Sequence, residues 1–508
     1  MMMKNIYRLI LTLFAVFTLT SCLKEDTSTV ISPDNFYKDA SQIMAGLNSA
    51  YYPLNYIYRF EFMIALEGST DLASTDGSKQ KDAQLLINPA DPGCGDRVWT
   101  YCYVGVRNAT SVLAGIERSS LEYKDKVDFI GEAKIIRAFY YYILTSFFGD
   151  VPFYLDYIET TEEQTRIGKL PRMSATETRK ALIADLMDVV PYMKQIRTCD
   201  IPQSDTRPGK ATASMGWMLI AKLAMWDKDW DTALEALSKL EHIYGDFKKY
   251  ELEDIQFSRK LTPESIFEVQ HAYAKGGVSM AGNVATVCMP QRNGGTGNIF
   301  DDVVIDTLGT EATAYTPLRP TAYMKETIMP TKVKDKRRDL NMVRSWGVDE
   351  KGNPCYFPSS HTWMGPKFWC YNMYSTNDSN NYPIFRYADA LLMAAECHCE
   401  KKDLSEAIRY YNMVRSRATG TDNALTPSYL TVQDEIRKER ARELFGEFQR
   451  KFDLVRWGIW YSNTKAYNKY SSLQNAIEPC HEYYPIPDSQ VLASGNQLDN
   501  DEYKKYGL

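Results

Sequence analysis

The stretch that decides the fold runs from Tyr387 to Ile408 and reads YADALLMAAECHCEKKDLSEAI. Residues 213–234, ASMGWMLIAKLAMWDKDWDTAL, follow the same plan 174 positions earlier. In both stretches an apolar segment leads through a short turn with an aspartate into a second helical pattern, and small residues there let antiparallel helices approach closely. Two pairs of alanines coincide at this offset: Ala221 with Ala395, and Ala233 with Ala407. Two hairpins of one design predict a mainly α-helical scaffold of tetratricopeptide-like hairpins.

Other segments with helical spacing of apolar residues extend this scaffold. They are residues 41–51, 98–117, 127–148, 176–194, 211–226 and 431–448. Ser174, three residues ahead of Glu177, predicts a capped helix start. The helix over 431–448 is dense in charge, and its spacing predicts the pairs Asp434–Lys438 and Glu439–Arg442. We interpret that charge run as a solvated or structurally paired helix face.

The first residues carry an export signal. Lys4 and Arg8 precede an uncharged run of twelve residues, Leu9 to Thr20, which is closed by Leu19-Thr20-Ser21-Cys22. Such a run is too short to cross a bilayer, which needs about 20 residues, but it fits the core of a secretory signal. We therefore expect a lipoprotein signal peptide over residues 1–21, lipidation of Cys22, a polar tether over 22–35 and one domain over 36–508. An ordinary signal peptide with an incidental cysteine is the alternative.

Composition and motifs argue against several function classes. The net charge is −6, and no stretch concentrates Lys and Arg among aromatic residues, so we expect no nucleic-acid partner. The sequence has no HExxH, no Walker loop and no GxGxxG, so we expect no enzyme. Nine cysteines follow Cys22 without a CxxC pair, which gives no sign of zinc or redox chemistry. Cys397-His398-Cys399 lies in a predicted helix, where adjacent side chains diverge, so we interpret it as ordinary helix residues.

Residues 255–385 form a long irregular insertion, rich in Gly, Pro, Asn and aromatic residues, with strand-like pieces such as 265–270. Insertions of this length are usually functional. Eight aromatic residues fall within 29 positions: Trp346, Tyr356, Phe357, Trp363, Phe368, Trp369, Tyr371 and Tyr374. Exposed rings of this kind stack on the apolar faces of sugars; the alternative is that they pack beneath the insertion, as we expect for Phe368 and Trp369.

The candidate ligand-binding residues are Trp99, Trp346, Tyr356, Trp363 and Tyr371. Trp99 is included because it begins a predicted helix directly after a Gly- and Pro-rich loop, residues 88–95. We expect no cofactor. A structural calcium ion held by oxygens of Asp301, Asp302 and Asp306 is the one metal site that the sequence offers.

Short motifs follow one another in a fixed order from Cys22 to Asn500. They include Lys24-Glu25-Asp26 after the cysteine, Arg137-Ala138-Phe139-Tyr140, the FGDVP of residues 148–152, the RYADALLMAAE of residues 386–396, the ERAREL of residues 439–444, Tyr484-Pro485-Ile486-Pro487 and Leu498-Asp499-Asn500. This series resembles the SusD/RagB family of outer-membrane nutrient-binding lipoproteins.

The resemblance implies a mostly α-helical fold with about four tetratricopeptide-like hairpins and a ligand site on the irregular side. It also implies a partner, a TonB-dependent transporter of the SusC type, over which the lipoprotein acts as a lid. Acidic residues after the lipidated cysteine are a feature of surface-exposed lipoproteins in such bacteria, so Cys22 is expected to anchor the chain to the outer membrane, facing the cell exterior. In the starch-binding relatives, a tryptophan in the region of Trp99 belongs to an aromatic platform.

The leading hypothesis is therefore a surface protein that binds oligo- or polysaccharides and delivers them to a SusC-like transporter. A RagB-like protein that binds peptides in the same kind of complex is the main alternative, and solvent exposure of Trp346 and Trp363 would favour the glycan. A surface hydrolase and a tetratricopeptide adaptor without a small ligand are further alternatives.

Overall fold

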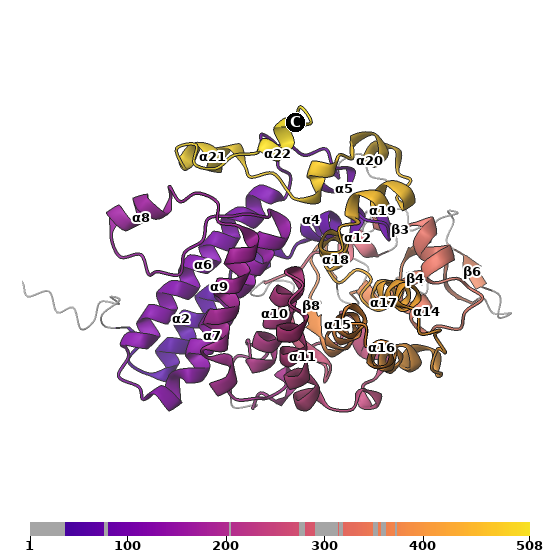
Figure 1. Ribbon diagram of the computed structural model, residues 1–508, viewed down its shortest axis with the longest axis horizontal. Helices are drawn as coiled ribbons and strands as arrows, with labels where there is room; N and C mark the ends of the chain where they lie inside the picture. Colours follow the sequence, from indigo (N-terminus) through magenta and orange to yellow (C-terminus); the bar gives the residue numbers. More distant parts are fainter. Residues whose placement is uncertain are drawn as a thin grey trace, which may run out of the picture.

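Helices make up most of the protein in the computed structural model (Figure 1). It describes residues 36–75, 80–202, 205–273, 280–289, 313, 318–348, 354–356, 362–370 and 373–508. For residues 345–348 and 354–356 it describes the backbone alone. The mainly α fold confirms the prediction from the helical spacing. Among these described residues, none of the helices has the length and apolar character needed to span a membrane.

The N-terminal part is a helical bundle, drawn in indigo to magenta in Figure 1. Its helices are α2 (Ala40–Tyr51), α3 (Leu54–Ile57), α4 (Phe60–Met63), α5 (Lys81–Gln84), α6 (Gly95–Arg118), α7 (Tyr123–Phe147), α8 (Thr161–Ile167) and α9 (Ala175–Met187), with a π-helical turn, η1 (Ile64–Gly68), after α4. Helices α6 and α7 approach closely at Gly105, where a Cβ atom would lie 2.1 Å from the ring of Tyr140. A glycine is required there, because a side chain would force the two helices apart.

Two helical hairpins lie beside this bundle: α10 (Ala213–Trp226) with α11 (Trp230–Tyr244), and α15 (Tyr387–Glu400) with α16 (Leu404–Thr419). Their turns share one geometry. Lys228 and Lys402 have φ of +58° and +67°, and the following aspartates, Asp229 and Asp403, cap the second helix by accepting a backbone hydrogen bond. The four alanines paired in the sequence are buried. The prediction of two hairpins of one design is confirmed.

The insertion between the hairpins is closed at its base by two strands. β2 (Ser265–Val269) pairs antiparallel with β8 (Tyr382–Arg386), so the chain leaves and re-enters the helical scaffold at one point. Three further antiparallel pairs involve β1 (Ala73–Thr75) with β3 (Leu318–Pro320), β4 (Met342–Val343) with β7 (Trp363–Met364), and β5 (Ser345–Val348) with β6 (Pro354–Tyr356). Short segments α12 (Ala285–Cys288), η6 (Met324–Ile328) and α14 (Arg337–Asn341) complete it. An irregular insertion with short strands was predicted.

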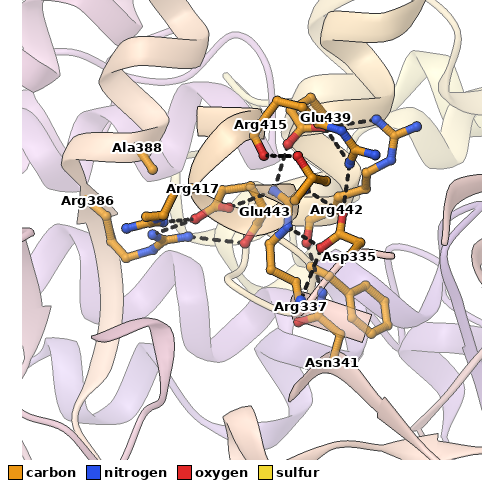
Figure 2. Close-up of polar contacts among 12 residues, drawn as sticks. Asp335, Arg337, Asn341, Arg386, Ala388, Arg415, Arg417, Glu439, Arg442 and Glu443 are labelled. Atoms are coloured by element: carbon orange, nitrogen blue, oxygen red, sulfur yellow. Dashed lines mark hydrogen bonds and ion pairs between the residues drawn. The ribbon is translucent and has the colours of Figure 1, made fainter. Parts of the chain in front are cut away.

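Buried ion pairs fasten this insertion to α17 (Tyr429–Glu443) (Figure 2). The carboxylate of Glu443 accepts from three arginines: Arg337 of α14 at 2.8 Å, Arg386 of β8 at 3.0 Å and Arg417 of α16 at 2.6 Å. Burial alone would raise the pKa of Glu443, but the three guanidinium groups outweigh burial and hold its pKa below the ordinary range. The predicted pairs Asp434–Lys438 and Glu439–Arg442 both form. The charge run of α17 is therefore a structurally paired face.

The C-terminal part runs from the middle of Figure 1 to its top, in gold to yellow. It contains α18 (Arg450–Arg456), α19 (Trp460–Tyr467), α20 (Ser471–Ala476), α21 (Asp488–Ala493) and α22 (Asp501–Lys504). Two predicted helices end earlier than expected. Helix α9 stops at Met187 because Pro191 cannot continue it, and α17 stops at Glu443 shortly before Gly446, whose φ is +74°. The single domain over 36–508 stays a prediction.

Candidate functional site

Trp99, predicted as a ligand-binding residue, lies in the core. It sits on the first turns of α6 with 4% of its surface exposed. Its ring centroid is 5.1 Å from that of Tyr103 and 5.1 Å from that of Phe148. The expectation of an exposed ring at this position is corrected, because α6 turns this face towards the end of α7.

Trp363 is also buried, with 3% of its surface exposed. It lies in β7 within a small apolar cluster that includes Met289, Trp369 and Met373, and the guanidinium carbon of Arg319 lies 4.7 Å from its ring centroid. In this arrangement the ring has no face open to a sugar, which corrects the predicted platform at this residue. Phe368 and Trp369 are buried, as expected for core residues.

The remaining predicted residues lie where the structure gives no side-chain description. Trp346 belongs to β5 and Tyr356 to β6, which form a hairpin at the edge of the insertion, but their side chains are outside the described atoms. Tyr371, Cys22 and the three aspartates of the predicted calcium site, Asp301, Asp302 and Asp306, lie outside the described residues. The roles proposed for these residues stay predictions.

Exposed aromatic rings gather instead on the N-terminal bundle, at Tyr52, Tyr56 and Tyr101. We call these three residues the tyrosine platform. Tyr52 follows α2 and is 52% exposed, whereas Tyr56 on α3 and Tyr101 on α6 are half-buried. The rings of Tyr56 and Tyr101 are stacked, with centroids 4.3 Å apart and planes at 6°. The ring of Tyr52 meets that of Tyr56 edge-on at 5.1 Å.

The local sequence explains why the rings meet. Pro53 starts the short helix α3 immediately after α2, so Tyr52 and Tyr56 are four residues apart and their hydroxyl groups are hydrogen-bonded to each other. That hydrogen bond is the largest cause of the raised pKa of Tyr52. Helix α3 packs across α6, which brings Tyr101 beneath Tyr56.

A bidentate ion pair borders the tyrosine platform. Arg97 lies one helical turn before Tyr101, on the same face of α6, and donates to both oxygens of Glu61 on α4, at 3.2 and 2.9 Å. Both side chains keep about a quarter of their surface exposed, at 26% and 28%. The preceding residue of α4 is tied to the insertion, since the N–H of Phe60 donates to the side-chain oxygen of Asn283 at 3.0 Å. The ion pair therefore ties α6 to α4, and the hydrogen bond of Phe60 ties α4 to the insertion.

This arrangement suits binding more than bond cleavage. Ring faces and edges offer apolar contact to a flat ligand, and Arg97 and Glu61 supply a donor and an acceptor for hydroxyl groups next to them. Most of the binding residues predicted from the sequence lie in the insertion, so the tyrosine platform is not among them. A signal was present in the stretch YYPLNYIY, residues 51–58, where four tyrosines surround a proline, but its exposure depends on how α3 packs.

Comparison with known proteins places the chain in a family. The profile described as "SusD family" matches residues 263–503, and the profile "Starch-binding associating with outer membrane" matches residues 34–196. SusD-like protein P25 of Formosa agariphila is 24% identical to the chain, over 99% of both proteins.

Solved structures share the fold. Surface glycan-binding protein A from Bacteroides uniformis has a TM-score of 0.72 at 23% identity, covering 92% of this chain and 100% of that protein. Surface glycan-binding protein A from Bacteroides thetaiotaomicron, solved in complex with laminarihexaose, has a TM-score of 0.71 at 19% identity, covering 91% and 100%. Since the two profiles together span most of residues 34–503, and relatives and structures agree over nearly the whole chain, this protein belongs to the SusD family.

Proposed function

We propose that this chain is a carbohydrate-binding protein of the cell surface, which holds oligosaccharides on the tyrosine platform and does not cleave them. The observation that carries the proposal is the stacked, partly exposed pair Tyr56–Tyr101 beside the Arg97–Glu61 ion pair. Rigid aromatic rings next to a few polar groups are a common way to bind sugars, because the ring faces match the apolar faces of the sugar and the polar groups match its hydroxyls.

The family relationship supports the same proposal. A relative of the same fold was solved with laminarihexaose, and the profile matched by the N-terminal part describes starch binding in association with the outer membrane. In the proposed function, a lipid on Cys22 anchors the chain to the outside of the outer membrane. The bound oligosaccharide then passes to a TonB-dependent transporter of the SusC type, on which this protein acts as a lid.

Titration of the purified chain against a glycan panel tests the ligand. The panel includes laminarihexaose, maltohexaose and oligosaccharides of other linkages, and calorimetry measures each affinity. We expect at least one class to bind, with Tyr101→Ala weakening that binding. Chromatography of the same mixtures should show intact oligosaccharides. Shortened products would favour the hydrolase, binding of peptides alone would favour the RagB-like alternative, and an absence of any ligand would favour the adaptor.

The transporter partnership needs a separate measurement. Purification of the chain from its native outer membrane should bring down a TonB-dependent barrel in stoichiometric amounts, and mass spectrometry of Cys22 should show the lipid. Recovery of the chain without a barrel, under conditions where the lipid is intact, would contradict the partnership but leave the ligand proposal in place.

A further inference from the structure

A second surface site lies at the C-terminal end of the fold, away from the tyrosine platform. A cavity of about 400 Å³ opens between the corner that follows α7 and the segment that carries the C-terminus. Phe148, Gly149 and Asp150 line one side, and Tyr483 and Tyr506 line the other. Cavities of about 300 to 1,000 Å³ are typical of small-molecule sites.

Tyrosine rings form much of the lining of this cavity, which we call the C-terminal cavity. Tyr506 is 42% exposed, and Tyr483 is half-buried. Gly149 has φ of +77°, and the ring of Tyr483 passes 3.6 Å from the place where a Cβ atom at Gly149 would lie. The ring of Tyr483 therefore lies beside the backbone at Gly149. The buried rings of Tyr484 and Tyr503 lie behind it.

Several polar groups at the cavity are already used by the protein itself. Arg172 donates to the carbonyl oxygen of Asp150 at 3.0 Å and to the carboxylate of Glu502 at 3.1 Å. The side-chain amide of Asn500 is satisfied by the backbone of Ile486, with which it exchanges hydrogen bonds of 2.8 and 2.9 Å. These groups shape the wall and leave little capacity for a ligand.

Other polar groups at the C-terminal cavity are still available. Within the part of the chain that the structure describes, the half-buried carboxylate of Glu482 has no hydrogen-bond or ion-pair partner, and neither the ammonium group of Lys505 nor the hydroxyl of Tyr506 has one. Burial raises the pKa of Glu482, although the amine of Lys451 opposes this effect. The carboxylate oxygens of Glu482 are therefore free to accept hydrogen bonds from a ligand.

We propose that the C-terminal cavity is a second carbohydrate subsite, which binds one neutral hexose unit against Tyr483 and Tyr506. A sugar hydroxyl both donates and accepts, so it can use Glu482 as acceptor and Lys505 as donor within one cavity. Because the available groups include one carboxylate and one ammonium, they do not select strongly for an ionic ligand. The choice of a sugar as ligand class rests on the proposed function; the cavity and its free groups do not.

The test compares variants of the full chain in binding of methyl β-D-glucopyranoside, methyl α-D-glucopyranoside, glucosamine, laminarihexaose and maltohexaose, followed by ligand-observed NMR and calorimetry. Glu482→Gln and Tyr506→Ala probe the C-terminal cavity, and Tyr101→Ala probes the platform. Glu162→Gln is the matched control, because Glu162 is an exposed carboxylate on α8 outside both sites. We expect Glu482→Gln and Tyr506→Ala to weaken binding of a neutral glucoside at least fivefold, with the control Glu162→Gln leaving it unchanged.

The outcomes separate the two proposals. If wild type binds oligosaccharides and only Tyr101→Ala weakens them, the proposed function stands and the second subsite is overturned. Preference for protonated glucosamine over both neutral glucosides would overturn the assignment to a neutral sugar. If no sugar binds to the wild-type chain at all, the proposed function and the subsite both fail. Melting curves of each variant verify that it is folded, so that a loss of binding reports on the cavity.

Discussion

The rings of Tyr56 and Tyr101 lie face to face, 4.3 Å apart and within 6° of parallel, although they come from α3 and α6. Each ring limits the rotation of the other, so both are held in place before any ligand arrives. A preorganised ring loses less conformational entropy on binding than a mobile one. This pair is therefore better suited to hold a ligand than the more exposed single tyrosines elsewhere on the surface.

Loss of the Tyr101 ring should weaken carbohydrate binding. Tyr101→Ala removes the partner of Tyr56 and one contact face, and a contact of this type is worth about 0.5–1.5 kcal/mol beyond the area that it buries. We expect about a tenfold weaker affinity for the best oligosaccharide of the panel, measured by calorimetry. Tyr101→Phe keeps the ring and should stay within about threefold of wild type.

A tyrosine outside the platform provides the matched control. Tyr192 is 67% exposed and makes no ring contact with another aromatic residue among those that the structure describes. Tyr192→Ala should leave the affinity unchanged. Equal losses in the variants at Tyr101 and Tyr192 would indicate a nonspecific effect of removing surface rings, and the platform would lose its support.

Removing one member of the buried ion-pair network around α17, part of which Figure 2 shows, should lower the stability of the protein strongly. Arg386 donates to Glu264 at 2.6 Å, to Glu443 at 3.0 Å and to Glu447 at 2.7 Å, all buried. Arg386→Met would leave these carboxylates without one shared cation, and removing one member of a buried network typically costs about 3–5 kcal/mol. Chemical denaturation should show this loss as a lower midpoint at an unchanged m value.

An exposed ion pair gives the comparison. Arg118 and Glu159 lie 2.9 Å apart, with half or more of each side chain exposed. Arg118→Met should lower the free energy of unfolding by less than about 1 kcal/mol, because solvent screens such pairs. A similar effect of both substitutions would mean that burial does not set the strength of the network around α17.

Features with local causes could be predicted from the sequence. The two hairpins were predictable because their helical spacing, the turn lysines at positive φ and the capping aspartates all act within a few residues. The pairs Asp434–Lys438 and Glu439–Arg442 follow from helix geometry alone. The family resemblance implies the same mainly helical fold.

The candidate site could not be predicted in this way, because burial of a ring depends on distant segments. Trp99 is covered by Phe148 from the end of α7, and Trp363 is covered by residues from three separate parts of the insertion. Nothing next to either tryptophan in the sequence encodes these contacts. The tyrosine platform likewise combines the segment after α2 with α6, and periodicity does not report on how two such elements meet.

The two helical hairpins should lose similar amounts of stability when the capping aspartate of each turn is removed. The N–H of Thr232 donates to Asp229 at 3.1 Å, and that of Glu406 donates to Asp403 at 3.3 Å. Asp229→Ala and Asp403→Ala should each lower the free energy of unfolding by about 1 kcal/mol. Ser428 precedes α17 without a capping hydrogen bond from its side chain, so Ser428→Ala should have little effect. Denaturation of the three variants checks this, and a cap effect confined to one hairpin would contradict the shared design.

The buried amine of Lys451 should make stability depend on pH in the alkaline range. It donates to the carbonyl oxygen of His481 at 2.9 Å and lies 4.8 Å from the ring centroids of both Trp460 and Tyr484. Burial lowers its pKa to about 7. In the unfolded chain a lysine keeps its proton up to a pKa of about 10.4, so unfolding above pH 7 takes up a proton.

Raising the pH from 7 to 9 therefore makes unfolding of the wild-type chain less favourable, by up to about 1.4 kcal/mol per pH unit from this group. Lys451→Met has no proton to take up and lacks this contribution. Denaturation at pH 7, 8 and 9 should show the free energy of unfolding rising in wild type relative to Lys451→Met. Lys194→Met, which removes a lysine with 81% of its side chain exposed, should instead parallel wild type. Parallel curves for Lys451→Met as well would mean that Lys451 stays protonated in the folded protein at pH 9, contrary to its lowered pKa.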